Sequence, residues 1–237
     1  MERHRFIEEL EAIAPPQAAD EYDEGRIGLI VEGVGEIGRV ACALDATPPV
    51  VLRAAELGAD ALVVHHTPIW DPVTRVEGGL ARVLGTALSA GMNVYVMHSN
   101  FDRAPGGIND ALADLLGLRD RVRLSLGVLG TCALALEEVS SRLGGALRVW
   151  GGEAVRSPLR LAVAGGSAFD LPLIREAAEA GATAYLSAEL KHSVARLSPL
   201  PLLESTHYAL EAPGMRALAA WQGWAFIEDP PSLITVP

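Results

Sequence analysis

The stretch Ala54-Ala-Glu-Leu-Gly-Ala-Asp-Ala61 recurs near the other end of the chain as Ala177-Ala-Glu-Ala-Gly-Ala-Thr-Ala184, with identity at six of eight positions. In each copy the alanine-rich start is typical of the end of a helix, the glycine terminates that helix, and the last residues begin an apolar strand. The strand before each copy starts at an arginine, Arg39 or Arg160. A repeated strand–helix–strand unit predicts an internal duplication.

The same alternation of strands and helices extends over the rest of the chain. Helices are expected at 3–13, 48–57, 74–90, 107–116, 137–146, 172–180 and 214–221, and strands at 26–32, 39–45, 61–64, 93–97, 159–164, 183–186, 200–203 and 224–227, with a less clear strand–helix–strand segment at 121–150. This order predicts the α/β class: two related, intimately packed α/β lobes with mixed sheets flanked by helices. The chain, 1–237, is expected to be a single unit with lobe one at about 1–120 and lobe two at about 121–237, and the lobes are free to interleave.

Composition narrows the class of protein. The 237 residues are 50% hydrophobic and carry a net charge of −11, so a folded core is expected and a basic nucleic-acid face is not. Cys42 and Cys132 lie in apolar runs, which predicts buried thiols rather than a disulfide framework. The N-terminus lacks a hydrophobic signal core, and no apolar run approaches the length of about 18 residues that a membrane span requires. A cytoplasmic location is therefore expected.

Histidines and carboxylates gather where strands are expected to end. His98 and His207 are each followed four residues later by a carboxylate and then by Ala-Pro-Gly, and His65-His66 ends a third apolar run. Ligands of α/β sheets bind beyond the carboxyl ends of the strands. The expected ligands of a two-metal centre are His65, His66, Asp102, His207 and Glu211. This mixed nitrogen and oxygen set suits two divalent ions of Zn, Mn, Fe, Co or Ni better than Ca or Mg alone.

Other side chains near these motifs are candidates for catalysis. His98 is the repeat partner of His207, but we expect it to orient Asp102 rather than to bind metal. Glu189 aligns with His66 in the repeat and is followed closely by Lys191 and His192. We expect these four side chains, Glu189, Lys191, His192 and His98, to position a substrate or to move protons.

Two glycine-rich segments are more simply interpreted as connections between elements than as ligand-binding loops. Gly33-Val-Gly-Glu-Ile-Gly38 fits the dinucleotide-binding pattern, but that pattern requires a helix after it, and residues 39–45 favour a strand. A nucleotide-dependent oxidoreductase is therefore a minor alternative. Pro105-Gly106-Gly107 is most simply a tight turn into a helix, although its N–H groups beside cations also suit a phosphate or carboxylate.

Three stretches together resemble the Nif-three-like dinuclear metal family, also called GTP cyclohydrolase I type 2-like. They are Ala59-Asp-Ala-Leu-Val-Val-His65-His66, His98-Ser-Asn-Phe-Asp102-Arg-Ala-Pro-Gly106-Gly-Ile-Asn-Asp110 and His207-Tyr-Ala-Leu-Glu211. The resemblance implies the same five metal ligands, two α/β lobes, a toroidal homohexamer and a cytoplasmic location in bacteria. This chain departs from the family at Tyr22-Asp23-Glu24-Gly25-Arg26-Ile27-Gly28-Leu29, where a Trp-Asp-Asn-x-Gly-Leu element is common, and at Thr206, where a glycine is common.

Two functions remain open at this point. Two ions with open coordination positions suit a metal-dependent hydrolase, cyclohydrolase-like or acting on phosphoesters, with metal-bound hydroxide as the nucleophile and an unknown small molecule as substrate. The alternative is a non-catalytic protein for metal storage, metal delivery or regulation, which needs the same ligands without a substrate pocket.

Overall fold

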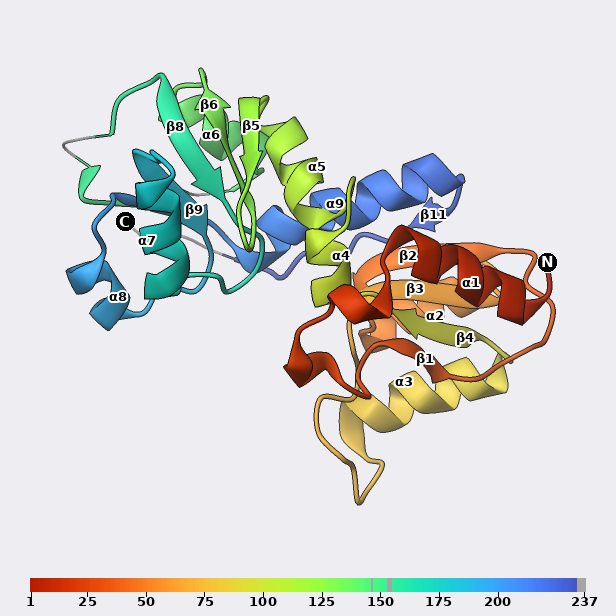
Figure 1. Cartoon of the computed structure of the whole chain (residues 1–237). Helices are drawn as coiled ribbons and strands as arrows, with labels where there is room; N and C mark the ends of the chain where they lie inside the picture. The colour runs from red at the N-terminus through yellow and green to blue at the C-terminus, as the bar shows by residue number, and fades with distance from the viewer. Residues whose placement is uncertain (146, 153–154, 234–237) are drawn as a thin grey trace. The chain divides into compact units, whose positions relative to one another are not determined.

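The computed structural model describes residues 1–145, 147–152 and 155–233 (Figure 1). The chain divides into two compact units. Unit 1 comprises Met1–Gly107 and Met215–Pro230, and unit 2 comprises Ile108–Gly214 with the described residues that follow Pro230. Unit 1 is therefore discontinuous in sequence, because residues 215–230 follow the whole of residues 108–214.

Unit 1 is built around a mixed sheet whose strand order is β1-β4-β3-β2-β11. Its strands are β1 Gly28–Val31, β2 Val40–Asp45, β3 Ala61–His66, β4 Asn93–Val96 and β11 Ala225–Phe226. Its helices are α1 Arg3–Ile13, α2 Pro48–Glu56, α3 Gly78–Ser89 and α4 Ser99–Arg103, with short 3-10 turns η1 Pro16–Ala18 and η2 Glu21–Asp23. Strands β2, β3, β4 and β11 run parallel, and β1 is antiparallel to β4.

Helices cover both faces of this sheet, as Figure 1 shows for α1 and α3. Val50 of α2 and Val83 of α3 belong to the apolar core on one face. On the other face the Cys42 thiol of β2 lies 3.4 Å from the Met215 carbonyl oxygen. A fold with both faces covered explains why the central strands are almost continuously apolar.

Unit 2 contains a mixed sheet with the order β5-β6-β8-β9-β10-β7. Its strands are β5 Arg119–Arg123, β6 Val128–Cys132, β7 Arg148–Trp150, β8 Leu159–Val163, β9 Ala184–Ser187 and β10 Leu202–Glu204. Its helices are α5 Ile108–Leu115, α6 Leu136–Arg142, α7 Leu171–Glu179 and α8 His192–Leu197. Helix α9, His207–Gln222, begins in unit 2, and its residues from Met215 belong to unit 1.

The core of unit 2 also has two layers. Leu112 of α5 and Val139 of α6 belong to the apolar cluster on one face of the sheet. Ile174 of α7 and Val194 of α8 belong to a second cluster. The α/β class with mixed sheets and flanking helices is therefore confirmed.

The two units share a strand order. In unit 1 the sequence β2-α2-β3-α3-β4 forms three parallel neighbours, and β1 is added antiparallel beside β4. In unit 2 the sequence β8-α7-β9-α8-β10 does the same, and β7 is added antiparallel beside β10. This shared topology is what the predicted duplication requires, and the repeated alanine-rich stretches end α2 and α7 and begin β3 and β9.

Several elements differ from the sequence prediction. Helix α3 begins at Gly78 rather than near residue 74, and α9 begins at His207 rather than near residue 214. The short helices α4 and α8 had no predicted counterpart. The segment expected to be strand–helix–strand contains two strands, β5 and β6, before its helix. The helix expected at 137–146 ends at Arg142, and Ala146 lies outside the described residues.

Two negative expectations can also be compared with the structure. The segment from Gly33 to Gly38 joins β1 to β2, so the helix that the dinucleotide-binding pattern requires does not follow it. Cys42 and Cys132 are both buried free thiols, as predicted. None of the helices in the described part of the chain combines the length and apolar composition that crossing a bilayer requires.

Candidate metal centre

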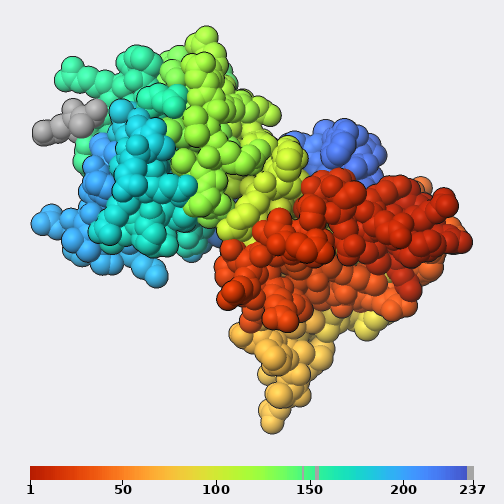
Figure 2. Space-filling view, in the orientation of Figure 1, coloured from red at the N-terminus to blue at the C-terminus, as the bar shows by residue number. Residues whose placement is uncertain are grey.

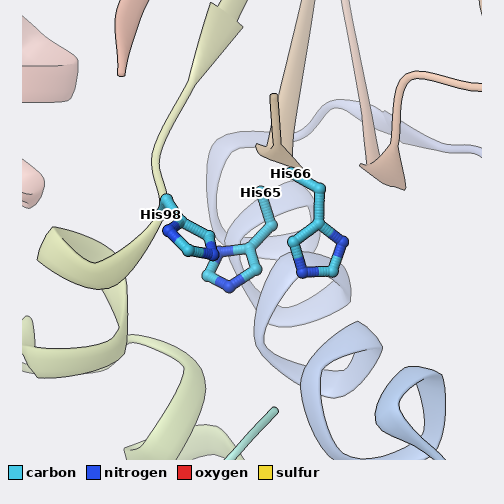
Figure 3. Close-up of side chains that lie close together, drawn as sticks. All are labelled: His65, His66 and His98. Atoms are coloured by element: carbon cyan, nitrogen blue, oxygen red, sulfur yellow. The ribbon is translucent and has the colours of Figure 1, made fainter. Parts of the chain in front are cut away.

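Three histidines of unit 1 converge beyond the carboxyl ends of neighbouring parallel strands (Figure 3). His65 and His66 are the last residues of β3, and His98 lies two residues beyond the end of β4. One potential ligand atom from each of the three lies within 4.8 Å of the others. The ring centroid of His65 is 4.9 Å from that of His66 and 4.9 Å from that of His98. The parallel pairing of β3 with β4 thus brings together residues more than thirty positions apart.

Oxygen acceptors fix the tautomers of His65 and His66. The Nδ1 atom of His65 lies 2.7 Å from the carbonyl oxygen of Met97, and the Nδ1 atom of His66 lies 2.7 Å from Oδ1 of Asp45. Carbonyl and carboxylate oxygens only accept hydrogen bonds, so each Nδ1 carries a proton and donates it. A neutral imidazole protonated at Nδ1 has its lone pair on Nε2, which is then the atom that can bind a metal.

His98 is held by a buried carboxylate. Asp23 accepts hydrogen bonds from Nδ1 of His98 at 2.9 Å, from the backbone N–H of Ser99 at 3.1 Å, and from the Ser99 hydroxyl. Burial alone would raise the pKa of Asp23, but the hydrogen bonds from His98 and Ser99 outweigh it and lower the pKa below its ordinary value. A charged Asp23 therefore fixes His98 in the same tautomer as its neighbours.

Asp102 faces this histidine cluster from α4. Its Oδ1 atom lies 3.6 Å from Nε2 of the fully buried His65. The Asp102 backbone N–H donates to the carbonyl oxygen of His98 at 3.1 Å, so its link to His98 passes through the backbone, whereas the His98 ring is held by Asp23. A carboxylate oxygen and an imidazole lone pair repel each other at short range unless they share a cation. The chemistry of this donor set therefore fits a divalent transition metal.

Unit 2 carries its own ligand candidates on the first turn of α9. His207 and Glu211 are one helical turn apart, and Nε2 of His207 lies 2.8 Å from Oε2 of Glu211. The Nδ1 atom of His207 lies 2.7 Å from Oε1 of Glu189. Nε2 of His207 and Oε2 of Glu211 cannot approach this closely as two bare lone pairs, so either a proton or a metal ion lies between them. The structure thus brings Glu189, which the sequence singled out separately, to the His207 and Glu211 pair.

The backbone around this pair is specialised. Glu189 has φ of +61°, a left-handed conformation that is unfavourable for a residue other than glycine. Gly166 has φ of +68°, and a Cβ atom at this position would collide with Oε1 of Glu211 and lie 3.5 Å from Nε2 of His207. Strained backbone conformations cluster at ligand and active sites, so both positions support His207 and Glu211 as candidate ligands.

Lys191 and His192 are placed differently from Glu189. Lys191 precedes α8, His192 begins it, and both are exposed. Among the described residues, no hydrogen bond or ion pair joins either side chain to His207 or Glu211. Their predicted part in substrate positioning stays a prediction.

Asp23 and Asp45 were not among the site residues predicted from the sequence. Asp45 is the last residue of β2 and pairs in register with His66 on β3, so a carboxylate at the end of the neighbouring strand was an available signal. Asp23 lies 75 residues before His98. No local pattern could connect these two residues, although Asp23 falls in the segment that departs from the Nif-three-like element.

The chain was compared with known proteins. A family model described as Duf34/NIF3 (NGG1p interacting factor 3) matches residues 1–221. A GTP cyclohydrolase 1 type 2 homolog from Methanocaldococcus jannaschii is 30% identical over 228 residues, which cover 91% of this chain and 92% of the relative. A homolog of the same name from Halalkalibacterium halodurans is 35% identical over 117 residues, which cover 48% of this chain and span 31% of the relative's length.

A solved structure shares the fold. Reduced HcgD from Methanocaldococcus jannaschii has a TM-score of 0.81 and 28% identity, covering 95% of this chain and 96% of that chain. The full-length fold match agrees with the family match and with the sequence resemblance. The chain therefore belongs to the DUF34/NIF3 family.

Proposed function

We propose that this protein is a hydrolase that depends on two divalent metal ions. The proposed ligands are His65, His66, Asp102, His207 and Glu211. The observation that carries the proposal is the hydrogen bonding of the histidines, because an acceptor oxygen at Nδ1 makes Nε2 the lone-pair atom of each ring. Bound ions would supply Lewis acidity for hydrolysis, and the name of the relatives, GTP cyclohydrolase 1 type 2 homolog, supports this reaction type.

The residues around the ligands have distinct proposed tasks. Asp45 and Glu189 orient His66 and His207, and a carboxylate at Nδ1 also makes the opposite nitrogen more basic. His98 can take up a proton at Nε2 during hydrolysis, because Asp23 stabilises the resulting positive ring. These roles assign proton transfer to His98 and positioning to Glu189.

The test is turnover by the full-length protein as purified and after loading with Zn, Mn, Fe, Co or Ni in turn. Ring opening of GTP and hydrolysis of p-nitrophenyl phosphate cover the two reaction types. We expect metal-dependent activity that is lost in Asp102→Asn and His66→Ala. His4→Ala is the matched control, because His4 is an exposed histidine on α1.

A different outcome would favour metal storage or delivery. Loaded protein that turns over neither compound, together with an Asp102→Asn variant that differs only in metal content, would contradict the hydrolase proposal. Rapid transfer of the metal to a chelator in the same samples would then support the delivery role.

We also propose the assembly and location that the family resemblance implies, a ring-shaped homohexamer in the cytoplasm. Analytical ultracentrifugation of the full chain tests the hexamer. A monomeric mass at micromolar concentration would contradict it.

A further inference from the structure

Two partly exposed aromatic side chains flank the ring of His98 in unit 1. The ring centroid of Trp70 lies 5.1 Å from that of His98 with an interplanar angle of 79°. The ring centroid of Tyr22 lies 6.0 Å away with an angle of 70°. Trp70 and Tyr22 are 42% and 53% exposed, so much of each ring remains available to a ligand beside the histidine cluster.

Arg26 connects the two segments that carry these rings. Its guanidinium donates a hydrogen bond from Nε to the carbonyl oxygen of Trp70 and another from Nη1 to the carbonyl oxygen of Tyr22. Its Nη2 atom lies 4.0 Å from the Asp71 carboxylate. One side chain thus joins the turn that contains Asp23 to the segment that follows His65 and His66.

Core packing does not account for these aromatic residues. Trp70 begins a run of exposed residues that continues to Gly79, and Figure 2 shows the segment between β3 and α3, in yellow-orange, projecting from unit 1. A large aromatic side chain that served only to fill the core would be buried. Instead, the backbone at both rings is fixed by hydrogen bonds while the rings stay accessible.

We propose that Tyr22 and Trp70 form a recognition surface for a planar heteroaromatic ring of the substrate, and that Arg26 positions both side chains. This inference rests on the proposed hydrolytic function, because it names the class of substrate for that site. Aromatic side chains bind planar bases by stacking. Because Arg26 already fixes the backbone at both residues, less conformational entropy is lost on binding, and the contact adds more to affinity.

The test compares two ligands that differ only in the ring. Guanosine 5′-monophosphate and ribose 5-phosphate carry the same sugar phosphate, so the ratio of their affinities for the full-length protein isolates the contribution of the base. Isothermal titration calorimetry should show the nucleotide binding about tenfold more tightly than the sugar phosphate. Equal affinities, or no measurable binding of the nucleotide, would overturn the proposal.

Variants locate the effect on the two rings. Trp70→Ala and Tyr22→Ala should each reduce the affinity ratio about fivefold or more, whereas Trp70→Phe should keep most of it. Trp221→Ala, which removes an exposed tryptophan of α9, is the matched control and should keep the full ratio. An unchanged ratio in both alanine variants would overturn the proposal.

The role of Arg26 has a separate readout. Arg26→Gln should lower the ratio, and adding it to a variant that already carries Trp70→Ala and Tyr22→Ala should lower it no further, because Arg26 acts through these two rings. A further loss on adding Arg26→Gln to that double variant would contradict the role. Turnover distinguishes this inference from the proposed function. If the protein prefers the nucleotide to the sugar phosphate but hydrolyses nothing, only the hydrolase proposal is contradicted. If it hydrolyses p-nitrophenyl phosphate but binds the nucleotide and the sugar phosphate equally, only the recognition surface is contradicted.

Discussion

At the scale of single residues, the candidate histidine ligands share one feature: a hydrogen bond from Nδ1 fixes the orientation of each imidazole ring. His65, His66 and His207 each donate a hydrogen bond from Nδ1 to an oxygen, which belongs to a backbone carbonyl in one case and to a carboxylate in the other two. The sequence predicted the candidate ligands, because histidine and carboxylate recur in a fixed pattern, and it also singled out Glu189, the partner of His207. It did not identify Met97 and Asp45 as partners of His65 and His66, because those contacts depend on how neighbouring strands align.

Replacing Glu189 tests whether that orientation matters. Glu189→Ala removes the acceptor at Nδ1 of His207, so the ring is no longer held in one tautomer and one direction. We expect metal affinity to fall by about 10- to 100-fold. Competition with a fluorescent chelator measures it. Glu179→Ala, at an exposed glutamate of α7, should leave the affinity unchanged, and equal affinities in both variants would refute the positioning role.

Replacing Gly166 tests whether metal binding depends on the close approach of the backbone to Glu211. Gly166→Ala should displace the Glu211 carboxylate, because the added Cβ would collide with Oε1, and should reduce metal affinity at least tenfold. Gly223→Ala is the matched control: its φ of +71° imposes a similar backbone strain, with nothing within 4 Å of the added Cβ. An equal loss of metal affinity in the two variants would contradict the collision, because backbone strain alone would then explain the loss.

At the scale of elements, most strands and helices could be predicted and the turns near the site could not. Strands β2, β3 and β4 lie where their apolar runs predicted them, because burial on both faces makes the signal strong. Helix α4 was missed because its five residues are too few for a periodic pattern. Helix α9 starts at His207, before the expected position, and Pro213 inside it concealed that start.

Replacing Asp23 tests how a turn that is distant in sequence supports α4. Its carboxylate accepts the backbone N–H of Ser99, the first residue of α4, as well as the His98 ring. Asp23→Ala leaves these buried donors without their acceptor, so the free energy of unfolding should fall by about 3 kcal/mol. Urea unfolding in excess chelator measures this loss separately from any metal effect. Asp71→Ala, at a carboxylate that is 91% exposed, should change the value by less than about 0.5 kcal/mol.

At the scale of the whole molecule, the chain repeats one topology in two units. The repeated alanine-rich stretch predicted a duplicated strand–helix–strand unit, and it marks the same helix-to-strand connection in both units. The division of the chain was harder to predict. The C-terminal half of α9 and β11 belong to unit 1, where β11 pairs with β2, and a pairing across such a separation leaves no local trace in the sequence.

The central claim is that the histidines and carboxylates described above hold divalent metal. Elemental analysis of full-length protein incubated with Zn, Mn, Fe, Co or Ni and then freed of unbound ion tests this claim most directly. We predict close to two ions per chain in the unaltered protein, a loss in His66→Ala and in His207→Ala, and unchanged content in His4→Ala. Metal content far below one ion per chain, or equal content in all four proteins, would contradict the account.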